Sequence, residues 1–197
     1  MSFVHLLVIL SVFVSIGGST AYIRDTFKGK TKPNRISWTM WAVAPLIGTG
    51  AALSSGADPW ATVKIFTAGF LPLVILLFSF LNPKSYWRLT LFDLLCGFCS
   101  VLAMLLWLVV DKPTYAILLA ATGDGFAGLP TLRKAWTHPE TETGITYIMG
   151  LISVLIILPS IPQWDIPNAS FQVYLIGINS ALIFAVYRKK MFHVQSV

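Results

Sequence analysis

The sequence predicts an all-α membrane protein of seven transmembrane helices, arranged as two parallel repeats of three helices with one linker helix between them. Composition is the first reason: hydrophobic residues make up 56% of the 197 residues and charged residues only 11%, against about 25% charged residues in soluble domains. Length is the second, because the chain has room for about seven spans of about 20 residues with short loops. The third is a stretch of the first half that recurs in the second half.

Seven apolar runs, each bounded by charged residues or by Pro and Gly, define the predicted spans. In chain order they cover residues 4–22, 36–53, 60–81, 89–110, 115–132, 145–162 and 171–187. Each run must form a helix, because lipid offers the backbone no hydrogen-bond partners and the runs lack the alternating pattern of a barrel strand.

The internal repeat has an offset of 109 residues, since Ala21 to Arg24 align with Pro130 to Arg133 (130 − 21 = 109). Further along, the aligned pairs are Ile36 with Ile145, Trp38 with Tyr147, Met40 with Met149 and, at an offset of 108, Pro59 with Pro167 and Gly69 with Gly177. We therefore divide the chain into a first three-helix repeat (1–82), a linker helix (83–111) and a second repeat with a short basic tail (112–197). Parallel repeats of this kind place a solute site near the bilayer midplane, where the two copies meet.

The basic residues predict the orientation in the membrane. With the amino terminus outside, the inside segments hold 12 of the 14 Lys and Arg residues: Arg24, Lys28, Lys30, Lys32, Arg35, Lys84, Arg88, Arg133, Lys134, Arg188, Lys189 and Lys190. Lys64 and Lys112 remain outside, near span ends where a long side chain can snorkel. Anionic lipid then accounts for the net charge of +6, and we expect the bilayer, not nucleic acid, as the partner.

The first apolar run has an alternative interpretation as a signal peptide cleaved after the small residues Ser19 to Ala21. A positively charged segment before the run is missing, and the run belongs to the repeat, so a transmembrane span is favoured. The short loops favour a bacterial inner membrane, and the distribution of basic residues predicts a cytoplasmic carboxyl terminus.

Asp124 is the most informative single residue, about midway along the fifth predicted span. A carboxylate at the bilayer centre costs at least about 2.5–3.5 kcal/mol on insertion scales, so it should face a wet cavity or a polar partner, or be protonated. We expect Asp124 to bind solute and to exchange a proton as the cavity opens to each side. The alternative is a fixed hydrogen-bond acceptor for a Tyr, Trp or Ser on a neighbouring helix.

Four more residues are assigned to the substrate site: Thr122, Asn179, Trp38 and Trp41. Thr122 neighbours Asp124, and Asn179 is a mid-span amide that could bind a polar solute or join two helices. Stacked aromatic rings suit sugars and nucleobases, so Trp38 and Trp41 are pocket candidates, with the aromatic belt at the headgroups as the alternative.

Four prolines in or near the spans are candidate hinges, because Pro removes a helical hydrogen bond and kinks the helix. They are Pro45, Pro72, Pro130 and Pro159. Pro130 and Pro159 lie within about a turn of predicted span ends, so helix termination is their alternative role. Cys96 and Cys99, in the fourth span, are interpreted as packing residues despite their Cys-x-x-Cys spacing.

The chain resembles the SWEET and PQ-loop superfamily of small membrane transporters over its full length. The resemblance rests on Pro130 to Lys134 followed by Pro139 to Glu142, similar to the family's Pro-Gln turn with its downstream segment, and on Gly177 to Ser180, which resembles the Asn-bearing last helix of SWEETs. Thr131 stands where the family has Gln, and Ala21 and Tyr22 replace Pro-Gln in the first copy, so a divergent member is indicated.

The residues and the resemblance together predict a transporter that moves a small polar solute, such as a sugar or an amino acid, by alternating access, with proton coupling through Asp124. The alternative is a receptor or assembly factor of the same fold that binds a peptide, a lipid or a partner protein. No nucleophile with a base, metal-binding cluster or phosphate loop occurs in the sequence, so we expect neither catalysis nor a cofactor or metal. Homo-oligomerisation is left open.

Overall fold

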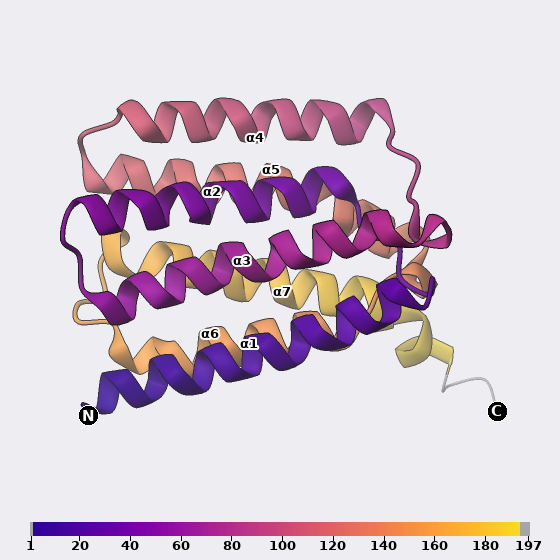
Figure 1. Ribbon diagram of the computed structural model, residues 1–197, viewed down its shortest axis with the longest axis horizontal. Coiled ribbons are helices and arrows are strands. Elements are labelled where there is room, and N and C mark those ends of the chain that lie inside the picture. Colours follow the sequence, from indigo (N-terminus) through magenta and orange to yellow (C-terminus); the bar gives the residue numbers. More distant parts are fainter. Residues whose placement is uncertain (1, 194–197) are drawn as a thin grey trace.

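A computed structural model describes residues 2–193 of the chain, which form seven α-helices and three short 3-10 helices. The α-helices are α1 (Phe3–Phe27), α2 (Arg35–Ser54), α3 (Pro59–Leu81), α4 (Leu91–Val109), α5 (Pro113–Thr137), α6 (Gly144–Ile157) and α7 (Ile166–His193). The 3-10 helices are η1 (Pro83–Ser85), η2 (Pro139–Thr141) and η3 (Leu158–Ser160). Figure 1 shows the seven α-helices running lengthwise along the molecule. The predicted all-α class and the number of helices are confirmed.

Polar side chains and prolines start several of these helices. The Asn34 side chain accepts hydrogen bonds from the first backbone N–H groups of α2, and Asp58 does the same for α3. Thr90 and Asp93 form a capping box at the start of α4. Such caps satisfy amide groups that have no partner within the helix.

The helices and the predicted spans differ mainly at their ends. α1 continues to Phe27, α5 to Thr137 and α7 to His193, beyond the predicted ends at 22, 132 and 187. Apolar runs mark only the part of a helix that faces lipid, whereas the backbone remains helical through the polar turns beyond it. α6 is shorter than predicted, because the chain tightens into η3 at Leu158, one residue before Pro159.

Five helices of the described chain are long and apolar enough to cross a membrane: α1, α2, α3, α4 and α7. α6 with η3 forms a shorter apolar helix, and α5 falls outside the five because Gly, Pro and Thr residues dilute its apolar ones. The outer surface fits a lipid environment, since α4 exposes large apolar side chains along its length: Leu91, Leu94, Leu95, Phe98, Leu102, Leu105 and Leu106. A helix with such a surface is stable in lipid.

The helices pack in a regular pattern of neighbours. α3 contacts both α1 and α2, and α7 contacts both α5 and α6. Between these groups, α1 contacts α6 and α2 contacts α5, while α4 lies against α5 and α2. The hydrophobic core gathers residues from six helices, without α4: Tyr22, Trp38, Ile75, Ala135, Tyr147, Leu182 and Ala185.

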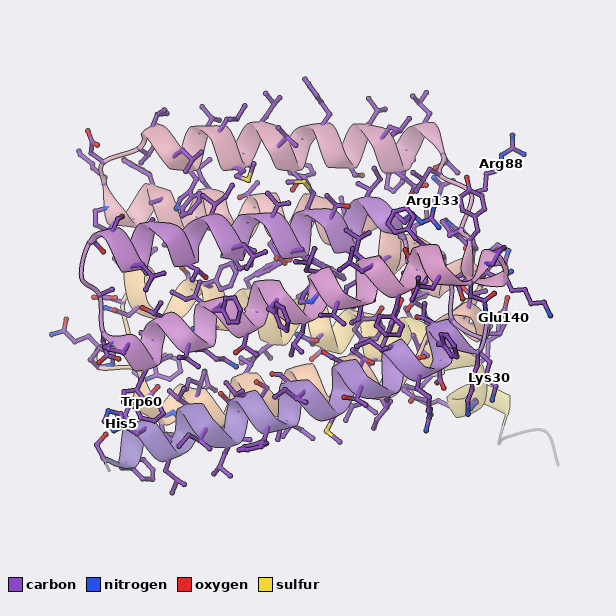
Figure 2. The ribbon with its side chains drawn as sticks, in the orientation of Figure 1. His5, Lys30, Trp60, Arg88, Arg133 and Glu140 are labelled. Carbon is purple, nitrogen blue, oxygen red and sulfur yellow. The ribbon has the colours of Figure 1, made fainter. Side chains whose placement is uncertain are left out.

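The two ends of the bundle differ in charge. Figure 2 shows His5 and Trp60 at the end that holds the amino terminus, with Lys30, Arg88, Arg133 and Glu140 at the opposite end. The rings of His5 and Trp60 stack with centroids 4.6 Å apart and join the starts of α1 and α3. We call the end with His5 and Trp60 the aromatic end and the other the basic end.

Candidate functional site

A cavity of about 260 Å³ lies inside the bundle, lined by six helices. This volume is slightly below that of typical small-molecule pockets, so it suits a small solute. Its walls are mostly apolar, with polar side chains at intervals from α1, α3, α5, α6 and α7: Ser15, Ser19, Lys64, Thr67, Asp124, Thr146, Ser153, Gln172 and Asn179. α4 does not line this central cavity.

Asp124 is half-buried in the wall of the cavity and has a specific partner on α7. The hydroxyl of Tyr174 donates a hydrogen bond to Asp124 Oδ2 at 2.6 Å, and the Trp41 side chain interacts with the same carboxylate. Gly125 faces the Tyr174 ring, and a Cβ there would make an ordinary van der Waals contact with the ring at 3.6 Å. Asp124 thus combines both sequence interpretations: it accepts a bond from a Tyr of a neighbouring helix, and it borders the cavity.

Lys64 brings a cation into the same wall. Its ammonium donates to Ser153 Oγ on α6 at 2.9 Å, and Ser15 of α1 also lies 2.9 Å from that oxygen. Lys64 was expected to snorkel to the membrane surface, and this expectation was wrong. The hydroxyl of Ser153 gives the ammonium a polar partner inside the bundle.

A second cavity of about 390 Å³ adjoins the first and extends to α4. The residues common to both linings are Pro45, Lys64, Ala68, Asp124, Phe171, Gln172 and Leu175. On its far side the second cavity is lined by Met104 and Trp107 of α4. Lys64 and Asp124 therefore stand in the partition between the two spaces.

Aromatic rings separate the central cavity from the basic end. Trp38 and Tyr147 line the cavity and are both almost fully buried. The ring of Trp38 packs on Trp41 at 5.2 Å and on Tyr22 at 4.7 Å between centroids. These rings close the space on the side of the basic end.

A buried ion pair lies directly beyond these rings. Lys134 Nζ is 2.6 Å from Glu142 Oε1, and the two side chains are 1% and 0% exposed. The other carboxylate oxygen of Glu142 accepts hydrogen bonds from Tyr22 at 2.9 Å and Tyr147 at 2.7 Å, and Lys134 also donates to the backbone carbonyl of Lys32. Buried charges are tolerated when they are paired and hydrogen-bonded in this way. The cluster joins α1, α5, α6 and the α1–α2 loop into a closed end.

The structure brings together four of the five residues predicted to bind substrate: Asp124, Asn179, Trp38 and Trp41 line the central cavity. Thr122 is not among the lining residues of either cavity. Its side chain is exposed and bonds the Leu118 carbonyl at 2.8 Å within its own helix. Each residue of an α-helix turns the side chain by about 100°, so the two steps from Thr122 to Asp124 place these side chains about 200° apart, on nearly opposite faces of α5.

Asn179 is positioned by a glycine on the facing helix. A Cβ on Gly150 would lie 2.6 Å from Asn179 Oδ1, so only Gly leaves room for the amide there. The Asn179 Nδ2 donates to the Leu175 carbonyl at 2.8 Å. The amide oxygen thus points across the gap between α7 and α6.

The candidate hinge prolines fall into two groups. Pro45 and Pro72 lie inside α2 and α3 and line the central cavity. Pro130 lies inside α5, because that helix continues beyond it to Thr137, and is buried away from both cavities. Pro159 belongs to η3 and marks the end of α6.

Sequence reasoning missed four polar residues of this region as functional candidates: Lys64, Ser153, Tyr174 and Glu142. Lys64 had a usable signal, because it follows the start of α3 by five residues (64 − 59 = 5), more than one turn into the helix. Ser153 and Tyr174 gave none, since single Ser and Tyr residues are common in membrane helices.

Cys96 and Cys99 are free thiols on α4, the first buried and the second half-buried. They lie outside the central cavity. Within residues 2–193, no group of three or more His, Cys, Asp or Glu side chains is placed to hold a metal ion. The polar chemistry of the interior is thus that of carboxylate, ammonium, hydroxyl and amide groups.

Comparison of the chain with protein-family models, with curated proteins and with solved structures finds no match.

Proposed function

We propose that this protein is a divergent SWEET/PQ-loop-like transporter, which moves a small polar solute by alternating access through the cavity between two three-helix repeats. The observation that supports the proposal is that both members of several residue pairs related by the predicted repeat line one cavity. We further propose that it resides in a bacterial inner membrane with the aromatic end outside and the basic end in the cytoplasm, because positive charge is retained inside.

The paired positions in the lining of the central cavity support the repeat. At an offset of 109 they are Ser15 with Asp124, Trp38 with Tyr147, Trp41 with Gly150 and Pro45 with Val154; at 108 they are Lys64 with Gln172, Thr67 with Leu175 and Leu71 with Asn179. The helix contacts agree, since the pairs α1·α6 and α5·α2 exchange when the two repeats are exchanged. A solute bound between the two proposed repeats would be reached from either side of the membrane as the repeats rock.

The closed basic end supports alternating access. In the described conformation, the rings of Trp38 and Tyr147 and the Lys134–Glu142 pair separate the cavity from that end. Release into the cytoplasm requires these groups to part, and Pro45 and Pro72 give α2 and α3 bending points beside the cavity. Asp124, at the centre, is the group that we propose to take up and release a proton during this exchange.

The test is solute flux into liposomes that contain the purified protein, with a panel of sugars, amino acids, nucleosides and organic acids at acidic and neutral pH. We expect at least one solute to accumulate, and we expect Asp124→Asn to reduce its flux at least about tenfold. Asp111→Asn is the matched control, because Asp111 is exposed in the α4–α5 loop. Binding without flux of any bound compound would contradict transport and favour a receptor or assembly factor.

A further inference from the structure

Lys64 occupies an unusual position for a lysine of a membrane protein. It lies about 7.5 Å along α3 from the aromatic end, by the rise of an α-helix, and borders both cavities. Its long apolar stem could reach the surface, yet the ammonium is directed to α6. A cation in this place is energetically costly unless a polar or negatively charged group interacts with it.

The hydrogen bonds leave the ammonium with unused donors. An ammonium has three N–H donors, and Ser153 accepts one of them. Ser153 directs its own proton to the Ser11 carbonyl at 2.9 Å, which leaves its oxygen as the acceptor for Lys64. The ion pairs of the described chain lie elsewhere, at Arg24–Asp25 and Lys134–Glu142. Lys64 therefore lines the cavity without a carboxylate partner from the protein.

The repeat separates a structural role from a binding role. The position equivalent to Lys64 in the second repeat is Gln172 (172 − 64 = 108), which lines the same two cavities without a charge. The position equivalent to Asp124 is Ser15 (124 − 15 = 109), also neutral. At each of these two pairs of positions, the bundle therefore packs with a neutral side chain in one repeat and a charged side chain in the other. The result is a cavity with a positive pole on α3 and a negative pole on α5.

We propose that Lys64 binds the carboxylate of the transported solute through the N–H donors that the protein leaves unused, so that the substrate class is small monocarboxylates. This inference rests on the proposed transport function. A single ammonium matches a single negative charge, and Asp124 in the same wall would repel a doubly charged phosphate. Lys64 lies five residues into α3 and Asp124 eleven residues into α5 (124 − 113 = 11), both counted from the aromatic end. Asp124 is therefore roughly six residues, or about 9 Å, further from that end than Lys64. The remainder of the solute extends toward it and carries hydrogen-bond donors, hydroxyl or ammonium.

The experiment compares acids with related analogues in which a neutral group replaces the carboxylate: lactate with lactamide, alanine with alaninamide, and gluconate with glucose. Binding to the purified protein at neutral pH is measured as ligand-induced thermal stabilisation, and Kd by titration. We expect the protein to prefer the acid in at least one pair. Lys64→Gln should weaken binding of that acid about 10- to 100-fold, the range for a charge-assisted bond, and leave the neutral analogue unchanged. The first two pairs show whether hydroxyl or ammonium suits the far end.

Two control variants keep the result interpretable. Lys112→Gln removes an exposed cation at the same end of the bundle, outside both cavities, and should leave the acid preference intact. Lys64→Arg retains the charge and should keep most of the preference. If Lys64 only tied α3 to α6, Lys64→Gln would lower the melting temperature and leave the ratio of acid to neutral affinity unchanged, which would overturn the proposal. Binding of neutral analogues alone, or of no acid, would also overturn it, whereas flux of a sugar or nucleoside would leave the transport function standing.

Discussion

At the scale of single residues, the interior contains two charged systems of different kinds. Lys134 and Glu142 are in direct contact and fully buried, so they satisfy each other. Lys64 and Asp124 face a cavity and have hydroxyl partners on other helices. The Lys134–Glu142 pair suits a closure of the basic end that forms and breaks as a unit. Lys64 and Asp124 suit a site in which the solute provides the missing partner.

Glu142→Gln tests the closure. The substitution retains an acceptor for Tyr22 and Tyr147 but leaves the Lys134 ammonium buried without its carboxylate. Breaking one side of a buried ion pair typically costs about 3–5 kcal/mol, so we expect a large decrease in the free energy of unfolding, measured by denaturant or thermal melting in detergent. Glu140→Gln, at an exposed position two residues away, should change stability by less than about 0.5 kcal/mol. Equal melting temperatures for the two variants would show that the Lys134–Glu142 pair contributes little to stability.

At the scale of helices, close backbone contact between α2 and α3 depends on Gly69. A Cβ there would lie 2.9 Å from the Ala42 carbonyl oxygen and 3.0 Å from the Leu46 backbone nitrogen. Backbone atoms cannot rotate away, so the two helices would have to separate. Gly177, its equivalent under the predicted repeat (177 − 69 = 108), has open space around it.

Gly69→Ala should therefore destabilise the protein by about 1–3 kcal/mol, the usual cost of overpacking. Gly177→Ala should be neutral or stabilise the protein by up to about 1 kcal/mol, because Ala is the better helix former. Melting temperatures of the two purified variants, compared with wild type, measure the difference. A loss for Gly177→Ala as large as that for Gly69→Ala would contradict the packing described here.

The bending of α2 is the second property at this scale. Pro45 has no N–H for the carbonyl of Trp41, one turn earlier, and both residues line the cavity. If the bend is a hinge, Pro45→Ala should lower solute flux severalfold and leave solute affinity within about twofold. Pro113→Ala, at the first turn of α5 where Pro fits without strain, is the control. Weaker binding with unchanged turnover would identify Pro45 as a wall of the site instead.

At the scale of the whole molecule, the distribution of basic residues predicts the topology. Ala57 lies in the exposed α2–α3 loop at the aromatic end and Glu140 in η2 at the basic end. In a background with Cys96→Ala and Cys99→Ala, we expect Ala57→Cys to react with a membrane-impermeant maleimide on intact cells. Glu140→Cys should react only after the membrane is opened. The reverse pattern would invert the proposed orientation.

Several features of the site could be predicted from the sequence, while others could not. Asp124 stood out because a carboxylate in an apolar run is costly wherever the run folds, and Trp38 and Trp41 because neighbouring aromatic rings can stack on a solute. Thr122 was assigned by its proximity to Asp124 in sequence, but the helical twist turns neighbours to different faces. Lys64 was predicted to snorkel because hydropathy places it near the end of a span. Hydropathy carries no information about the Ser153 hydroxyl on the facing helix.

The sequence by itself determined that the described chain folds into seven helices with an apolar outer surface, because lipid leaves an unpaired backbone no alternative. The repeat at offsets of 109 and 108 is likewise a prediction from the sequence alone. Only the tertiary structure decided which polar groups meet: Lys64 with Ser153, 89 residues apart, and Asp124 with Tyr174, 50 residues apart. These partners depend on helix rotation and on the fit of one helix surface against another, and hydrophobic periodicity specifies neither to within a side chain.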